Sequence, residues 1–166
     1  MRKTKRTQQS HVRPSDAGRL WPAFVFELFK TYSRVNSAGD EIAREFGLSS
    51  ARWRVLGSAC QSPKTVSAIA RERGLTRQSV QQVVNSLIDD RLALLVENKD
   101  HKSAKLVAAT PAGKRAILHL NNQAIGWMNS IADSVSAHEL EMTTRILEKL
   151  RVHIETIMSN GGSGTD

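Results

Sequence analysis

One stretch of the sequence concentrates side chains that form paired hydrogen bonds with planar partners. At helical spacing it carries an arginine, three glutamines and an asparagine, namely Arg77, Gln78, Gln81, Gln82 and Asn85. In the major groove of DNA, arginine pairs with guanine, and glutamine or asparagine pairs with adenine. An ordinary solvated helix face would be richer in Glu and Lys, but residues 76–87 contain no acid. We therefore predict that this face reads DNA bases.

These side chains need a rigid support, and the surrounding residues predict a helix-turn-helix. Thr65 caps a short first helix, and Gly74 ends it because glycine adopts the left-handed conformation without steric cost. Thr76 caps the second helix, whose inward stripe consists of Val80, Val83, Val84, Leu87 and Ile88. The predicted DNA contacts of this unit are Thr65, Thr76, Arg77, Gln78, Ser79, Gln81, Gln82 and Asn85.

A hairpin is predicted directly after the second helix. Its strands are expected at residues 92–97 and 105–109, and a polar loop joins them. A helix-turn-helix followed by such a hairpin is a winged helix. Cationic side chains on a narrow loop reach phosphates or the minor groove, although a solvated loop without a partner is the alternative. The predicted wing contacts are Asp100, Lys102, Ser103 and Lys105.

The net charge of +8 is less informative than its distribution along the 166 residues. Five of those charges lie in residues 1–14, which hold no acid, so that +3 remains for residues 15–166. We expect residues 1–16 to form a disordered basic arm, because so polar a segment cannot bury enough apolar surface to fold. The arm would add non-specific attraction to phosphates.

The composition also indicates the cellular compartment in which the protein is expected. A single cysteine excludes an intrachain disulfide. No apolar run approaches the length of a bilayer span, and the basic N-terminus lacks the apolar core of a signal peptide. We therefore expect a cytoplasmic protein with no membrane partner.

Long helices are predicted on both sides of the winged helix. The first occupies residues 17–47, begins near Leu20 with Pro22 in its first turn, and ends at Gly47. Two more occupy residues 111–158, and Ser136 with Glu139 forms a capping box at the start of the last one. Their apolar stripes are too wide for one small lobe to cover. We expect a second copy to cover them, with an intramolecular bundle in a monomer as the alternative.

The expected fold is therefore mainly α (α+β): a winged helix-turn-helix at residues 48–110 with N- and C-terminal helices that form a dimerisation domain. Residues 159–166 are expected to be a disordered tail. A two-fold dimer would set two recognition helices one helical turn of DNA apart.

Other candidate chemistry is limited. Trp21, Phe24, Trp53 and Trp127 could line a pocket for an apolar or aromatic ligand where the first, second and fifth helices meet; plain core or dimer packing is the alternative. Cys60 shares a helix face with Trp53, which favours a buried, inert thiol over an oxidant sensor. The five histidines show no short ligand spacing with a cysteine, so neither a metal nor a cofactor is expected.

An enzyme is not expected either. The sequence shows no phosphate-binding glycine loop, no nucleophile elbow and no clustered acid–base pair. A winged-helix module that binds protein instead of DNA is the competing function. Salt separates the two, because DNA binding weakens steeply as salt is added.

Taken together, these motifs resemble the MarR family of bacterial transcriptional regulators. The similarity runs from residues 47–56 through the helix-turn-helix and the wing at 97–107 to the Thr-Pro-Ala-Gly run at 110–113. The order of elements fits over about residues 18–158. The wing and the Thr-Pro-Ala-Gly run are the most specific parts.

The resemblance implies a triangular homodimer with two winged-helix lobes, bound to an inverted-repeat operator as a repressor. It also implies release by a small ligand, often aromatic, bound between the lobes and the dimer helices. Asp100 and His101 match the family's wing, but Lys102 and Ser103 stand where arginines are usual. Lysine lacks the planar fork of arginine, so we expect a phosphate contact from Lys102 and more of the specificity on the face from Arg77 to Asn85.

Overall fold

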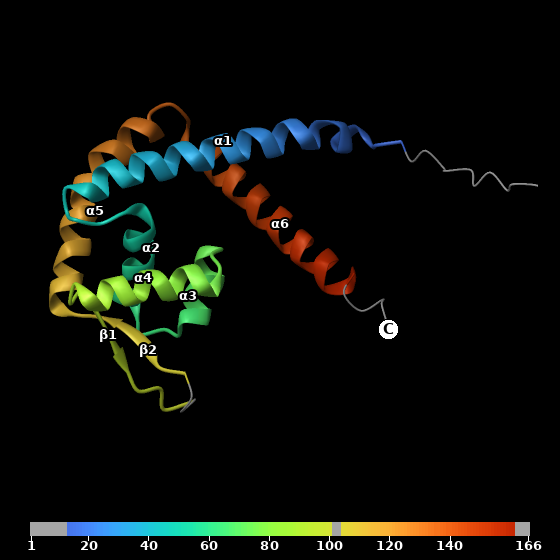
Figure 1. The fold of residues 1–166 in the computed structure, drawn as a ribbon. Coiled ribbons are helices and arrows are strands. Elements are labelled where there is room, and N and C mark those ends of the chain that lie inside the picture. The colour runs from blue at the N-terminus through green and yellow to red at the C-terminus, as the bar shows by residue number, and fades with distance from the viewer. Residues whose placement is uncertain (1–12, 101–103, 162–166) are drawn as a thin grey trace, which may run out of the picture.

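The computed structural model describes residues 13–100 and 104–161, which form six helices and one two-stranded antiparallel sheet (Figure 1). This confirms the predicted class, mainly α with a small hairpin. In chain order the elements are α1 (Asp16–Arg44), α2 (Ser50–Gln61), α3 (Val66–Arg73), α4 (Arg77–Asp89), β1 (Ala93–Val96), β2 (Leu106–Ala109), α5 (Pro111–Ala132) and α6 (Ala137–Gly161). α2 to α4 and the hairpin form one lobe, and α6 projects away from it.

α1 starts earlier than the sequence suggested. The Ser15 hydroxyl oxygen accepts a hydrogen bond from the Gly18 N–H at 3.1 Å, so Ser15 is the cap and the prediction of a start near Leu20 was wrong. Pro22 therefore lies inside the helix and not in its first turn. Its missing N–H removes one helical hydrogen bond. The helix ends at Arg44, and Gly47 has a φ of +65°, which turns the chain into α2.

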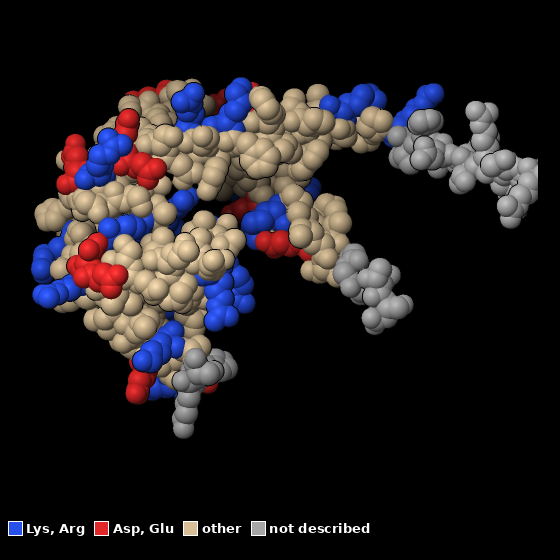
Figure 2. Space-filling view, viewed as in Figure 1, with Lys and Arg blue, Asp and Glu red and all other residues tan. Residues whose placement is uncertain are grey.

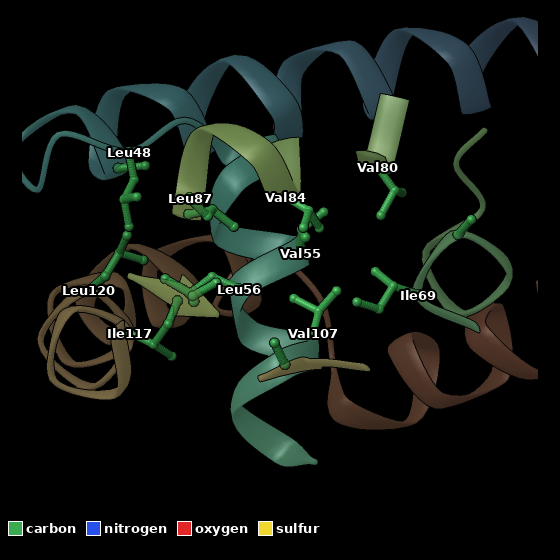
Figure 3. Packing of buried hydrophobic residues seen from close by; sticks show 14 residues of the cluster. Leu48, Val55, Leu56, Ile69, Val80, Val84, Leu87, Val107, Ile117 and Leu120 are labelled. Carbon is green, nitrogen blue, oxygen red and sulfur yellow. The ribbon is translucent and has the colours of Figure 1, made fainter. Parts of the chain in front are cut away.

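The hydrophobic core surrounds α2. Figure 3 shows side chains from neighbouring helices and strands pointing towards this helix. The fully buried apolar residues of the lobe and the adjoining α5 are Val55, Leu56, Ile69, Val80, Val84, Leu87, Val107, Leu120 and Ala124. Each element of the winged helix contributes at least one fully buried residue except β1, whose contribution is the nearly buried Ala93. The core therefore fixes α3, α4 and the hairpin relative to one another.

The hairpin is shorter than predicted. β1 pairs with β2 from Ala93 opposite Ala109 to Val96 opposite Leu106, so each strand has four residues. A third segment joins its edge: the Lys64 N–H donates to the Val107 carbonyl at 3.1 Å, and the Val107 N–H donates to the Lys64 carbonyl at 2.8 Å. The sequence did not predict this bridge.

The joint between the hairpin and α5 explains the Thr-Pro-Ala-Gly run. The Thr110 hydroxyl donates to the Arg91 carbonyl at 2.8 Å, and its oxygen accepts from the Gly113 N–H at 3.0 Å. A Cβ added at Gly113 would lie 2.1 Å from the Leu92 carbonyl oxygen, so no other residue fits without a shift. Glycine is thus required at 113 by packing, whereas Thr110 serves the joint through the hydrogen bonds of its hydroxyl.

The last helix confirms one prediction and corrects another. The Ser136 N–H donates to Glu139 Oε2 at 2.8 Å and the Glu139 N–H donates to Ser136 Oγ at 3.2 Å, which is the predicted capping box. The Ser136 hydroxyl also donates to Glu139 Oε2 at 2.7 Å, and this bond first, followed by the bond from the Ser136 N–H, lowers the pKa of Glu139. The predicted tail at 159–166 begins too early, because α6 runs to Gly161. Residues 162–166 lie outside the described part.

α1 and α6 leave large apolar side chains uncovered in the single chain. Phe29 is 66% exposed and Met158 is 72% exposed. Every described side chain of α6 is exposed or half-buried. A groove of about 610 Å³ runs between the two helices and is lined by Phe24, Leu28, Leu150 and Ile154, among others. None of the described helices is long and apolar enough to cross a membrane.

Candidate nucleic-acid interface

Local hydrogen bonds build the helix-turn-helix as the sequence predicted. The Thr65 hydroxyl oxygen accepts from the Ala68 N–H at 3.1 Å and caps α3. Gly74 ends α3 with φ 62° and ψ 34°, a left-handed conformation that favours glycine. The Thr76 hydroxyl oxygen then accepts from the Ser79 N–H at 3.1 Å and caps α4. Both predicted caps and the predicted helix stop are confirmed.

The two faces of α4 differ sharply. Val80, Val84 and Leu87 are fully buried. The opposite face carries the five predicted base-reading residues, all exposed: Arg77, Gln78, Gln81, Gln82 and Asn85. The Gln81 side-chain amide donates to Asn85 Oδ1 at 2.9 Å, which holds these two amides side by side. The core therefore presents an ordered hydrogen-bonding surface to the outside.

Three predicted contact residues have structural tasks as well. The Ser79 hydroxyl donates to the Thr76 carbonyl at 2.9 Å, so it helps to close the first turn of α4. Thr76 is exposed, whereas Thr65 and Ser79 are half-buried. Because hydroxyls at helix N-termini lie beside unpaired backbone N–H groups, a phosphate can be bound there. DNA contact by these residues stays a prediction.

The charge around α4 suits an anionic partner. Figure 2 shows Lys and Arg side chains beside α3 and the start of α4, and acidic side chains near the far end of α4. Asp90, which follows that far end, is paired with Arg52 of α2. Between Glu45 and Asp89 the sequence contains a single acid, Glu72. The start of α4 also carries the positive end of its helix dipole.

The wing is described only in part. The Asn98 side-chain oxygen accepts from the Asp100 N–H at 3.1 Å, which forms a tight turn as the loop begins. Asp100 is exposed, and so is Lys105, the residue before β2. Of the other predicted wing residues, His101, Lys102 and Ser103 lie outside the described residues.

The structure reveals a polar cluster that the sequence reasoning missed. Lys64 Nζ donates to Glu72 Oε2 at 2.6 Å, and the fully buried Ser58 hydroxyl lies 3.1 Å from Glu72 Oε1. Arg73 Nε donates to Ser58 Oγ at 2.6 Å. The hydrogen bond from Lys64 is the main reason that the pKa of Glu72 is lowered. The isolated acid in a basic segment was the signal that could have pointed to this cluster.

The four aromatic residues predicted to line one ligand pocket do not meet. Trp21 and Phe24 stack at 5.7 Å between ring centroids and line the groove between α1 and α6. Trp127 lines a hollow of about 480 Å³ between α1 and α5. Trp53 lines another hollow, of about 320 Å³. In the single chain these four residues therefore line three separate hollows and not one, and ligand binding by any of them stays a prediction.

The hollow beside Trp53 lies between α2, α5 and the end of α3. Its lining residues are Trp53, Gly57, Cys60, Gln61, Arg73, Ile117 and Asn121. Trp53 Nε1 donates to Asn121 Oδ1 at 2.9 Å and so fixes the indole ring as one wall. Cys60 is half-buried, less than predicted, and burial raises the pKa of its thiol. The reactive thiolate is therefore disfavoured. Among the described residues, no group of three or more His, Cys, Asp or Glu could hold a metal ion.

Comparisons with known proteins agree with this geometry. A model of the MarR family matches residues 46–102, which span α2 to the wing. An uncharacterized protein of Mycobacterium tuberculosis (strain CDC 1551 / Oshkosh) is 32% identical over 131 residues, which cover 79% of this chain and 92% of that relative. The similarity therefore extends beyond the winged helix into the terminal helices.

Solved structures share the fold. CouR from Rhodococcus jostii RHA1, bound to p-coumaroyl-CoA, superposes with a TM-score of 0.69 and 19% identity, covering 76% of this chain and 90% of that one. The M. tuberculosis transcriptional regulator MosR, in complex with DNA, gives a TM-score of 0.69 and 17% identity, covering 80% of this chain and 96% of that one. At such identities the likeness is one of fold.

Proposed function

Because the chain belongs to the MarR family of DNA-binding transcriptional regulators, we propose that it acts as a homodimeric repressor of an inverted-repeat operator. The observation that carries this proposal is the exposed, acid-free face of α4, held outward by the buried Val80, Val84 and Leu87. In this role Arg77 and Gln81 bind base edges in the major groove. MosR, which shares the fold, was solved in complex with DNA.

The uncovered faces of α1 and α6 support the homodimer. Side chains as large as Phe26 and Phe29 are more than 60% exposed there, and apolar surface on this scale marks an interaction site. A two-fold axis would cover the same faces on both copies. It would also place two α4 helices in successive major grooves, which is why the proposed operator is an inverted repeat.

A small aromatic ligand is proposed to release the DNA. The hollow beside Trp53 offers a fixed indole wall, and the Arg73 guanidinium at its edge could pair with an anionic group. CouR, of the same fold, was solved with p-coumaroyl-CoA bound. The hollow belongs to one protomer and lies against the end of α3, so a ligand there would act close to the recognition helix.

The DNA-binding proposal is tested by selecting bound sites from random DNA and then measuring affinity for the selected site. Arg77→Ala and Gln81→Ala should each weaken specific binding by about 1–3 kcal/mol. Lys149→Ala, at an exposed cation of α6, is the control and should leave specific binding nearly unchanged. If neither α4 variant changes binding, α4 does not read bases. A wild-type protein that binds no DNA even at low salt would favour the protein-interaction module instead.

The ligand proposal is tested by screening aromatic carboxylates for release of the selected DNA. A Cβ at Gly57 would meet nothing within 4 Å, so this position can be used to fill the hollow. Gly57→Leu should abolish the response to a hit, while Gly57→Ala should weaken it less. An unchanged response in Gly57→Leu would place the ligand elsewhere.

A further inference from the structure

Lys64 makes two connections, one through its backbone and one through its side chain. Its backbone forms the two hydrogen bonds with Val107 that join the α2–α3 connection to the edge of the wing. Its ammonium group donates to Glu72 in the last turn of α3 at 2.6 Å. One residue therefore connects the wing strand β2 to the helix that immediately precedes the recognition helix.

Glu72 is in turn anchored in the core. Its second oxygen, Oε1, lies 3.1 Å from the buried Ser58 hydroxyl of α2 and 3.1 Å from an Arg73 guanidinium nitrogen. The Lys64 and Glu72 side chains are only 22% and 32% exposed. Charge-assisted bonds that are partly shielded from water hold their geometry better than exposed surface ion pairs. The carboxylate thus ties Lys64 to α2 and α3.

An acid at this position is otherwise unfavourable. The C-terminal turn of a helix carries the negative end of its dipole, which disfavours a carboxylate. Glu72 is also the one acid in residues 46–88, within the lobe that is proposed to bind DNA, a polyanion. Loss of its charge alone would strengthen attraction to phosphates. Because both effects of the charge are unfavourable, we infer that the main contribution of Glu72 is the geometry that its hydrogen bonds fix.

We propose that Glu72 is a positioning residue, which fixes the wing relative to α4 through Lys64 and so increases discrimination between specific and non-specific DNA. Only Gly74, Leu75 and Thr76 separate α3 from α4, so an anchored end of α3 also sets the start of α4. With β2 held to the same point, the groove-reading helix and the wing approach DNA as one preorganised unit. The inference rests on the DNA-binding function of the lobe.

Glu72→Gln tests this, because it keeps the shape and removes the charge. We expect affinity for non-specific DNA to stay equal or rise and the ratio of specific to non-specific affinity to fall about tenfold, since charged hydrogen bonds are lost. Glu141→Gln is the matched control. It removes one negative charge and an exposed ion pair with Arg145 of α6, and should leave the ratio unchanged. Lys64→Arg preserves the pair and should retain the ratio.

A second measurement needs no DNA. The Val107 N–H, which donates to Lys64, should exchange with solvent faster in Glu72→Gln and in Lys64→Met but not in Glu141→Gln. Combining Glu72→Gln with Lys64→Met should add little to either change. Unchanged exchange at Val107, or equal gains on specific and non-specific DNA, would overturn the positioning role. A wild-type protein without sequence preference would instead refute the operator proposal, and exchange at Val107 would still decide this inference.

Discussion

The winged-helix lobe and the terminal helices differ in how much of their apolar surface one chain buries. In the lobe, Leu56, Ile69 and Leu87 are completely buried within one chain. In α1 and α6, by contrast, Phe29 and Met158 remain mostly exposed. The lobe therefore completes its core within one chain, together with residues of α1 and α5, whereas α1 and α6 leave large apolar side chains uncovered.

This difference assigns separate physical roles to the two regions. The core that holds the α4 face in place lies within one chain, and it includes Ala43 of α1 and Leu120 of α5. In the proposed homodimer, the apolar faces left open by one chain would make the arrangement of the two lobes depend on association, and hence on protein concentration. In the proposed function, base reading and the relative orientation of the two lobes would thus depend on different parts of the chain.

Leu56→Ala gives the largest expected effect and tests whether the lobe has its own core. Leu56 is fully buried, and the cavity left behind should lower the free energy of unfolding by about 2–5 kcal/mol. Urea denaturation at several protein concentrations measures this, and the loss should be the same at each one. Leu118→Ala, at a leucine that is 59% exposed on α5, is the control. Equal losses in both variants would contradict the comparison.

Substitutions at two glycines of α5 allow the winged-helix lobe and the terminal helices to be compared within one helix. Gly113→Ala places a methyl group 2.1 Å from the Leu92 carbonyl oxygen, and such overpacking should lower the free energy of unfolding by about 1–3 kcal/mol. At Gly126 an added Cβ meets nothing within 4 Å. Gly126→Ala should raise stability by about 0.5–1 kcal/mol, because alanine is the better helix former. Thermal unfolding of both variants shows whether each substitution lowers or raises stability. Two changes in stability of the same sign would refute the argument.

Phe29→Lys tests whether the open faces associate. A lysine in an apolar interface should raise the dimer dissociation constant at least about tenfold, or ~1.4 kcal/mol. Sedimentation velocity over a range of concentrations measures the change. Thr156→Lys adds the same charge to the exposed face of α6 that carries Lys149 and His153, and should leave the dimer intact. A protein that is monomeric in all three forms would favour the single-chain bundle.

The smallest effect is expected at the contact between α1 and α2, where the two regions meet. The Ser50 N–H donates to Asp40 Oδ1 at 2.6 Å, and this bond lowers the pKa of Asp40 from its ordinary 3.8. A lowered pKa in the folded state gives stability that is present above pH 3.8 and lost as the pH falls through the folded-state value. Asp40→Asn should therefore flatten this acid limb of the stability curve. Glu41→Gln controls for the loss of one acid, and identical curves for both variants would exclude the contact as the cause.

The sequence was most informative where structure is decided within a few residues. Thr65, Gly74 and Thr76 act on their own neighbours, so the helix-turn-helix could be predicted closely. The inward stripe of α4 was equally local, because helical periodicity alone separates its two faces. The capping box at Ser136 follows the same logic.

Features that depend on distant contacts escaped prediction. Ser58 and Glu72 are 14 residues apart and meet only because α2 and α3 pack together. The four aromatic residues were predicted to line one pocket, but their types gave no distances, and in the single chain they line three separate hollows. DNA contacts at Lys102 and Ser103 stay predictions.

The close approach of Gly113 to Leu92 has a mechanical consequence. α5 begins in direct contact with the segment that leaves α4, without the clearance that a side chain or a loose linker would give. A small tilt of α5 would therefore be transmitted to the lobe as a rigid rotation and would not be absorbed by bending at the joint. In the proposed homodimer, the distance between the two α4 helices would then follow the angle of α5.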